Sequence, residues 1–504
     1  MKNITILLLT LALVSCKDNF LELTPDTNGS VGNFYQTKDQ FIQAINSAYS
    51  PLQAIHNNNM WLFAEVRSDN TSYQLNTGDR SGTIREEIDE FRDNDQNNNY
   101  QTFFENSYKG IGRCNLLLTK IQTATFDQAS RNQIEGEARF LRAYYYFNLT
   151  RVFGDVPLIL KEVASPEEAF TTATRVPEAQ VLTAVIEDLK AAITKLPAKY
   201  TTLDLGRATS GAAKAILGEV YMTQKNYAAA SEILKGIEVD GGYSLNANYA
   251  DNFKKKNNSE SIFEVQYTEG VGNKWSTFIY SFAPFNSGTL ATGYALGAGS
   301  AAGWNIPTQD LINAYEPTDK RFAASINQNF TDPTSKKVIP FIQKYSNPPY
   351  LERFNTGDNF IVSRLADVLL MQAEALNEAS FPNADAFTLL NRVRTRAGLS
   401  AKTVDNVDAK LKVASQAEFR TAIAQERRIE LAFESHRWFD LVRTGQAIPV
   451  MTAHAIAEKA AKSYILPNSF INIPLKFPYP FREDRKSTRL NSSHSTLSRM
   501  PSSA

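Results

Sequence analysis

The sequence contains very little cysteine and histidine, with 2 Cys and 4 His in 504 residues. A zinc cluster needs several such ligands close together, and a disulfide scaffold needs several cysteine pairs, so neither is expected. Lysine plus arginine and aspartate plus glutamate both total 53, which gives a formal net charge of zero. A neutral chain has no overall field that attracts nucleic acid, so nucleic-acid binding is not expected either.

Motifs of catalytic sites are also missing. The sequence has no G-x-S-x-G, P-loop or H-E-x-x-H pattern. The glycine-rich residues 297–303 have their last glycine one position too late for a dinucleotide fingerprint, and no strand–turn–helix pattern surrounds them. We therefore expect no enzyme activity and no cofactor. The composition is otherwise that of a globular protein, with 43% hydrophobic and 21% charged residues.

A short apolar run lies near the N-terminus, at residues 4–14. It is too short to span a bilayer and is typical of a secretory signal. The Ser-Cys pair that follows resembles a bacterial lipobox, in which the cysteine is lipidated and becomes the mature N-terminus. We expect a lipoprotein signal peptide at residues 1–15, lipid attachment at Cys16 and a polar tether at residues 16–33. A plain secretory signal with an incidental cysteine is the alternative.

Most of the middle of the chain has the periodicity of amphipathic helices. In residues 130–152 and 176–196, apolar residues recur at steps of three and four. Looser helical patterns at 368–379 and 384–397 predict a helix pair, and residues 419–443 predict one long helix. Cys114 is expected to be a buried free thiol in a helical stretch.

Residues 209–237 predict a more specific arrangement of two helices. Gly218 and Ala230 are small where the two helices of a tetratricopeptide unit cross closely, and Tyr221 is expected to fill the groove. The pattern as a whole favours a mainly α fold with several paired helices.

Two insertions interrupt the helical pattern. Residues 61–100 are polar, and residues 275–304 are rich in aromatic side chains and glycine. Long segments without helical periodicity usually carry function. Aromatic rings offer apolar faces and Asp and Asn offer hydrogen bonds, a combination that suits a ligand-binding surface. We expect residues 61–73 and 275–304 to meet on one face, with core packing as the alternative for each aromatic. The candidate ligand-binding residues are Trp275, Trp304, Tyr280, Trp61, Tyr73, Asp69 and Asn70.

A dense charge cluster occupies residues 426–440. Carboxylates and guanidinium groups at these helical spacings pair readily, so a structural ion network is the favoured interpretation. Glu426 lies on the apolar side of the expected helix and should need a buried arginine partner. Trp438, within the cluster, is expected to be structural.

Five groups of motifs occur in a fixed order along the chain. They are EGEARFLRAY at 135–144 with FGDVP at 153–157, IPTQDL at 306–311 with AYE at 314–316, RLADVLLMQAEALN at 364–377, LNRVRTRAG at 390–398, and ERRIEL at 426–431 with RWFDL at 437–441. Together with the lipobox, this set resembles the SusD/RagB family of outer-membrane nutrient-binding lipoproteins of Bacteroidetes. The resemblance covers roughly residues 16–467 and implies a tetratricopeptide-like helix-pair scaffold with an irregular, loop-rich ligand-binding half.

The resemblance also implies a role. Family members capture a glycan, or in some cases a peptide, and act as a lid on a SusC-like TonB-dependent transporter. We therefore expect a non-catalytic lipoprotein anchored to the outer membrane and exposed at the cell surface; Lys17-Asp18 resembles the start of the family's surface-export signal. A surface glycan hydrolase is the alternative, with Glu65, Asp69 and Asp310 as candidate carboxylates. A structural or adhesive scaffold is a third interpretation.

The expected division of the chain follows the same resemblance. Residues 34–260 form an N-terminal SusD-like region with tetratricopeptide-like pairs. Residues 261–467 form a C-terminal RagB/SusD region with the aromatic and glycine-rich insertion and further helix pairs. Residues 468–504 depart from the family pattern, and their serine-rich end at 487–504 has no helical period, so we expect a non-native tail.

Overall fold

The computed structural model describes residues 34–483, except for positions 79, 164, 271, 273, 293–301, 349 and 351. The predictions for Cys16, the signal peptide, the tether and residues 487–504 lie outside the described residues. The described chain is mainly helical, as expected, and its sheets are pairs of short antiparallel strands. No helix in the described part is both long enough and apolar enough to cross a membrane.

The N-terminal helices form the scaffold of the molecule. The long helices pack on their neighbours along the chain, which is the arrangement expected of helix pairs. The elements of this half are α2 (Lys38–Asn58), α4 (Asn98–Lys120), α5 (Gln128–Phe153), α6 (Pro166–Thr172), α7 (Glu178–Lys195), α8 (Ser210–Thr223), α9 (Tyr227–Leu234) and α10 (Ile237–Gly241), with 3-10 turns η3 (Ile121–Thr123) and η4 (Thr202–Asp204) and strands β2 (Val156–Pro157) and β3 (Arg175–Val176).

The helix predictions in this half are confirmed. Helix α5 ends at Gly154, which has a φ of 76°, a conformation that glycine adopts without steric cost. Pro177 caps the start of α7. In the α8–α9 pair, a Cβ on Gly218 would lie only 2.4 Å from Leu234 Cδ2, so the close crossing that the sequence predicts is present. Cys114 is buried with a free thiol.

The C-terminal helices continue the scaffold. They are α16 (Leu365–Ala379), α17 (Ala384–Arg396), α18 (Gln416–Glu430), α19 (Arg437–Arg443) and α20 (Ala447–Ala461). Helices α16 and α17 form the second predicted pair, and α16 packs against α9.

The prediction of one long helix at 419–443 is wrong. The chain breaks between α18 and α19, where Phe433 and Ser435 adopt left-handed φ values of 69° and 66°. This turn points Glu434 at the buried Arg364 (2.8 Å) and brings the Ser435 N–H to the Glu65 carboxylate (3.0 Å). The break therefore serves contacts with distant segments that local periodicity does not encode.

The other half is built from short elements and loops. Strand β4 pairs with β8 inside the molecule, and β1 pairs with β5. Its elements are η2 (Leu62–Val66), β1 (Thr71–Ser72), α3 (Thr83–Asp89), α11 (Asp251–Lys254), β4 (Ser261–Val265), α12 (Phe278–Phe282), α13 (Thr289–Thr292), β5 (Ile306–Pro307), α14 (Gln309–Ala314), α15 (Arg321–Ser325), β6 (Ile326–Asn327), β7 (Phe341–Ile342) and β8 (Phe360–Arg364).

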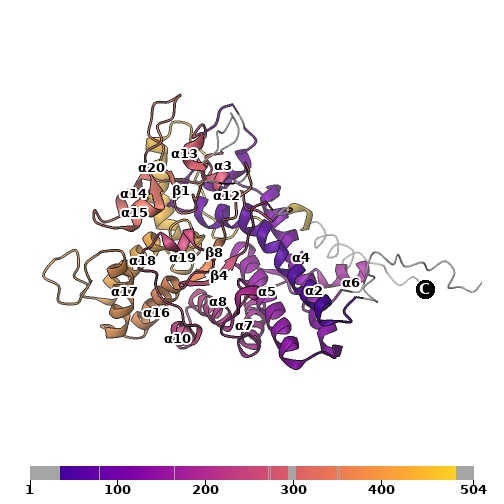
Figure 1. The fold of residues 1–504 in the computed structure, drawn as a ribbon. Coiled ribbons are helices and arrows are strands. Elements are labelled where there is room, and N and C mark those ends of the chain that lie inside the picture. The colour runs from indigo at the N-terminus through magenta and orange to yellow at the C-terminus, as the bar shows by residue number, and fades with distance from the viewer. Residues whose placement is uncertain are drawn as a thin grey trace, which may run out of the picture.

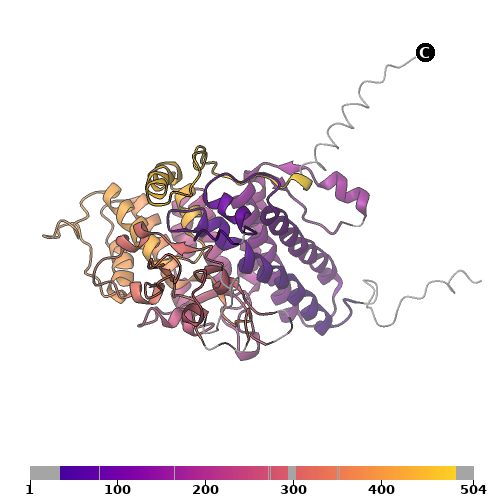
Figure 2. The ribbon, with the colours of Figure 1, turned by 90° about the horizontal axis from the view of Figure 1, so that it is seen from above.

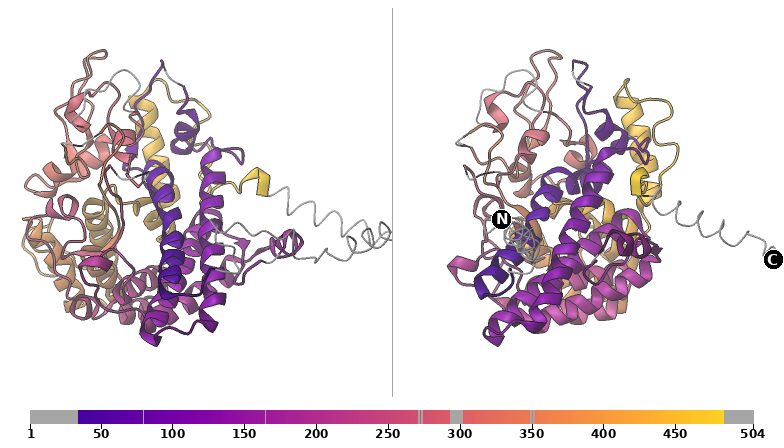
Figure 3. Two further views of the ribbon diagram at one scale, coloured as in Figure 1. Left: turned by 45° about the vertical axis from the view of Figure 1, so that its right-hand side comes forward. Right: turned by 90° about the vertical axis from the view of Figure 1, so that its right-hand side faces the viewer.

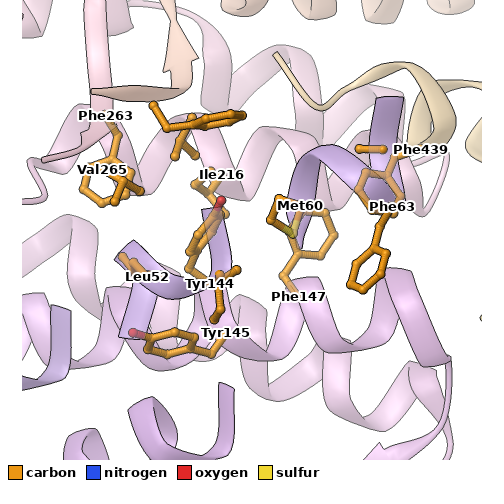
Figure 4. Close-up of a cluster of buried hydrophobic side chains, with 14 of the residues drawn as sticks. Leu52, Met60, Phe63, Tyr144, Tyr145, Phe147, Ile216, Phe263, Val265 and Phe439 are labelled. Carbon is orange, nitrogen blue, oxygen red and sulfur yellow. The ribbon is translucent and has the colours of Figure 1, made fainter. Parts of the chain in front are cut away.

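Figure 1 shows α3, α12, α13 and β1 gathered at the top of the molecule, and α5, α7 and α8 below them. Figures 2 and 3 show from other sides that the N-terminal helices, in indigo to purple, lie beside the later part of the chain. One hydrophobic core joins the regions: Leu52 and Phe147 share it with Phe263 and Phe439 (Figure 4). The division of the chain at residue 260 stays a prediction.

Part of the expected tail belongs to the folded body. Phe470 and Phe477 are buried, and the Phe477 N–H donates to the Val152 carbonyl at the end of α5 (2.8 Å). The expected start of the tail at residue 468 is therefore too early, because residues as far as Phe477 contribute to the hydrophobic core.

Candidate functional site

The two insertions meet, as the sequence predicts. Thr71 pairs with Pro307 in the β1–β5 ladder. Just beyond it, the Gln74 N–H donates to the Gly303 carbonyl at 2.7 Å, and the Gln74 side chain accepts from the Phe285 N–H at 2.7 Å. These bonds fasten residues 61–74 to the segment around α12.

Trp61 and Tyr73 do not contribute to a surface, which corrects their assignment. Trp61 is 1% exposed; its indole N–H donates to the Asn57 carbonyl (3.0 Å), and its ring meets Phe282 edge-on. Tyr73 is 4% exposed and its hydroxyl donates to Glu90. Trp61 leads from α2 into a helical turn that faces the core. The polar residues around it in the sequence therefore do not indicate that its side chain is exposed.

Asp69 and Asn70 are also buried, and both anchor arginines from the C-terminal helices. Arg437 donates to Asp69 at 2.7 Å, and Arg428 donates to the Asn70 side-chain oxygen at 2.9 Å. Burial alone would raise the pKa of Asp69, but Arg437 and Arg428 lower it to about 2. These two side chains are structural anchors, and their assignment as ligand contacts is corrected.

Trp275 and Trp304 remain partly exposed, and Tyr280 lies beneath the surface. The Tyr280 ring is buried and packs on Phe354, with ring centroids 4.7 Å apart. Phe354 itself is 37% exposed. The Ser276–Thr356 bridge places the loop that carries Phe354 beside Trp275.

Trp304 is held in a fixed position. The Arg85 guanidinium lies 3.8 Å from the centroid of its ring, at cation–π distance. The ring edge lies against Gly82, where a Cβ would come within 2.5 Å of the indole nitrogen. Within the described part of the chain, Arg85 has no carboxylate partner, and the indole of Trp275 makes no ring contact or hydrogen bond.

Helix α12 holds Trp304, and Trp275 precedes the helix by three positions. The Trp304 N–H donates to the Ser281 carbonyl at 2.9 Å. Trp275 lies six positions before Ser281, a span of at most about 20 Å, so both tryptophans lie within about 25 Å of one another. We call the set Trp275, Trp304, Phe354 and Arg85 the aromatic face.

Two members of the aromatic face, Arg85 and Phe354, are not among the residues that the sequence predicts for the site. Arg85 lies in the polar insertion and could have been noted as a cation near aromatic residues. Phe354 lies outside both insertions and carries no local signal.

Of the three candidate carboxylates for hydrolysis, Glu65 and Asp69 are buried, and Arg428 bonds both Asp69 (2.9 Å) and Asp310 (2.7 Å). Glu65 is fully buried, accepts from the Ser435 N–H and Asn70, and has its pKa raised to about 7 by burial. Asp69 is ion-paired, and Asp310 is exposed beside Arg428. The described residues contain no group of three or more side chains suited to hold a metal ion.

The charge cluster is a buried ion network, as predicted. Glu426 accepts from Arg321 at 2.7 Å and from Arg394 at 3.0 Å, which confirms the expected arginine partner. Arg364 joins Glu260 and Glu434. Trp438 is fully buried and structural.

Comparisons with known proteins agree on one family. Residues 327–471 match the model of the SusD family, and residues 19–222 match the model "Starch-binding associating with outer membrane". The chain is 28% identical to "SusD-like protein P2" of Formosa agariphila, over 92% of this chain and 95% of that protein.

Solved structures agree. A "Laminarin binding SusD-like protein" is 27% identical with a TM-score of 0.73, covering 90% of this chain and 98% of that one. "Surface glycan-binding protein A" from Bacteroides uniformis is 25% identical with a TM-score of 0.70, covering 91% and 98%.

Proposed function

Because this chain belongs to the SusD/RagB family, we propose that it is a non-catalytic outer-membrane lipoprotein that captures a glycan and delivers it to a SusC-like TonB-dependent transporter. The observation that carries glycan capture is the aromatic face, in which two tryptophans are partly exposed and Trp304 is bonded to α12. The names of the similar proteins, which include a laminarin-binding protein, support the same ligand class.

The chemistry of the aromatic face suits a sugar chain. Indole rings offer wide apolar faces for the C–H surfaces of sugar rings. Arg85 covers part of Trp304, and no carboxylate among the described residues occupies its donors, so these can bond neighbouring hydroxyls. A ring that is held in place before binding loses little conformational entropy when a ligand arrives.

The anchor and the location rest on the N-terminal motif and on the family description. Lipidation of Cys16 would hold the protein at the outer membrane, with the partner transporter beside it. Cys16→Ser should abolish lipidation, because the thiol is the acyl acceptor, and the protein should then be recovered in the soluble fraction. A variant that stayed tightly membrane-bound with a normal mature N-terminus would contradict the lipoprotein proposal.

The test of glycan capture is calorimetric titration of the purified protein with laminarihexaose and with maltohexaose. The double variant Trp275→Ala/Trp304→Ala should bind at least about tenfold more weakly, a loss of about 1.4 kcal/mol or more, while its melting temperature changes little. Trp438→Phe, altered in the core away from the aromatic face, is the control and should bind normally.

The same samples separate the alternatives. If new reducing ends appear during incubation with either saccharide, the protein is a hydrolase and the non-catalytic proposal fails. If the double variant binds as tightly as the wild type, the aromatic face is not the site.

A further inference from the structure

A second cavity lies in the helical part of the molecule, away from the aromatic face. It has a volume of about 780 Å³, within the range of small-ligand pockets. Helices α16, α18, α19 and α20 and the turn before α9 form its walls, and none of the four residues of the aromatic face lines it. Figure 1 shows α16, α18 and α19 below α12 and α3. We call this cavity the helical cleft.

The floor of the helical cleft consists of charged side chains that are already paired. Arg443 bonds both Glu374 and Asp440 at 2.8 Å. Arg427 bonds Asp440 at 2.9 Å and continues to Asp367 at 2.8 Å. Burial alone would raise the pKa of Asp440, but Arg427 and Arg443 lower it, so the carboxylate stays ionised. The floor therefore offers donors and acceptors with little net charge.

The rim of the helical cleft combines the exposed cations Lys225 and Arg420 with neutral hydrogen-bonding side chains and small apolar patches. Tyr227 is half-buried at the mouth, and its hydroxyl makes no hydrogen bond within the described part of the chain. Leu441 and Val450 supply apolar surface. The neutral polar side chains of the rim are Thr421, Gln425, Thr444 and Gln446.

These features select between classes of ligand. A phosphate or other strong anion would meet the carboxylates Glu374, Glu378 and Asp440, and the arginines that line the cleft are already paired, which leaves Lys225 at the rim as its main cationic partner. An apolar ligand would displace the water that bonds the paired charges and would form no hydrogen bonds in its place. This desolvation costs free energy. A neutral ligand with many hydroxyl groups and apolar C–H faces matches the paired floor, the amide and hydroxyl rim and the Tyr227 ring.

We propose that the helical cleft is a second saccharide-binding site, specific for a neutral sugar chain. This inference rests on the proposed function, because it assigns the same ligand class to a second place on the chain. The two sites would hold different parts of one glycan or two separate chains.

A plug in the helical cleft tests the proposal. Gln446 is exposed at the rim, so Gln446→Trp should fill the cleft without disturbing the core. Thr452→Trp, on the exposed face of α20 outside the cleft, is the matched control. With maltohexaose or laminarihexaose, the wild type and Thr452→Trp should bind about two chains per protein and Gln446→Trp about one. Tyr227→Ala should weaken the same site, and Tyr227→Phe, which keeps the ring, should weaken it less.

The double variant Trp275→Ala/Trp304→Ala separates this proposal from the proposed function. In that background, the binding that remains should be lost when Gln446→Trp is added. If the wild type binds one chain and the double variant binds none, the helical cleft is not a site and glycan capture at the aromatic face stands. If Gln446→Trp abolishes all binding and the double variant binds normally, the helical cleft stands and the aromatic face falls. If neither saccharide binds the wild type, both proposals fail for neutral glucans.

Discussion

The helical scaffold and the aromatic face are held together in different ways. In α5, the apolar residues that recur along the helix are the ones that pack against α4 and α7. Around the aromatic face, the contacts join residues that are far apart in the chain: the Thr277 N–H donates to Asn57, and Arg428 donates to Asn70. Local periodicity therefore specifies the scaffold, while long-range polar bonds specify the surface that it carries.

A buried ion network lies between the two regions. Arg364, at the end of β8, bonds Glu260 and Glu434 at 2.7–2.8 Å and also bonds Glu430. Arg437 and Asp69 continue the connection toward the aromatic face. If this network holds the face on the scaffold, a break in it should be more damaging than the loss of any surface ion pair.

The largest effect is expected from Arg364→Met. Removing this guanidinium takes one cationic partner from each of three buried carboxylates, although Arg396, Arg321 and Lys344 still pair with them. The free energy of unfolding should fall by about 3–5 kcal/mol. Arg392→Met on α17 is the control: Arg392 is 36% exposed and pairs with Glu238 at the surface, and its loss should cost less than about 1 kcal/mol. Urea denaturation of both variants measures the difference. Equal losses would show that the buried network does not join the two regions.

The second prediction concerns the pH dependence of stability. Burial raises the pKa of Glu65 from 4.5 to about 7, so the folded state holds this proton more tightly than the unfolded state. Stability should therefore fall as the pH rises from about 4.5 to about 7, by about 3 kcal/mol from this group. Glu65→Gln should remove that contribution. The difference in free energy of unfolding between wild type and variant, measured from pH 4 to pH 8, isolates it.

Asp69, four positions further on, should show the opposite sign. Its pKa is lowered to about 2 because Arg437 and Arg428 outweigh the effect of burial. Its contribution to stability is present above about pH 4 and is lost as the pH falls toward 2, by about 2 kcal/mol. Asp69→Asn is thus the control for the direction in which stability changes with pH. If both variants shifted stability in the same direction with pH, the contrast between the two carboxylates would be wrong.

The same pair of residues shows the limit of prediction from sequence. Asp69 and Asn70 look like exposed loop residues because their neighbours in the chain are polar. Their partners Arg437 and Arg428 lie more than 350 positions away, and no local pattern indicates that pairing. The break between α18 and α19 has the same cause, since Glu434 turns toward the distant Arg364.

By contrast, α5, α7 and the α8–α9 pair could be predicted because their signals are local. Helical period, a glycine at the end of a helix and small residues at a crossing are all visible within about 30 positions. The aromatic face falls between these cases. Trp275 and Trp304 are candidates from the sequence because they lie in a glycine-rich segment without helical period. Phe354 has no such signal, because its place beside Tyr280 is set by tertiary packing alone.

The last prediction tests whether small residues at a helix crossing determine the stability of the scaffold. Gly218→Leu should lower the free energy of unfolding by about 1–3 kcal/mol, because its side chain would force α8 and α9 apart where a Cβ already comes within 2.4 Å of Leu234. Gly112 on α4 is the matched control: a Cβ there meets nothing within 4 Å, so Gly112→Ala should stabilise the protein by about 0.5–1 kcal/mol through helix propensity. Thermal and urea unfolding distinguish the two. If Gly218→Leu leaves the free energy of unfolding unchanged, the close crossing of α8 and α9 is not needed for stability. Local sequence signals would then not report which contacts hold the scaffold together.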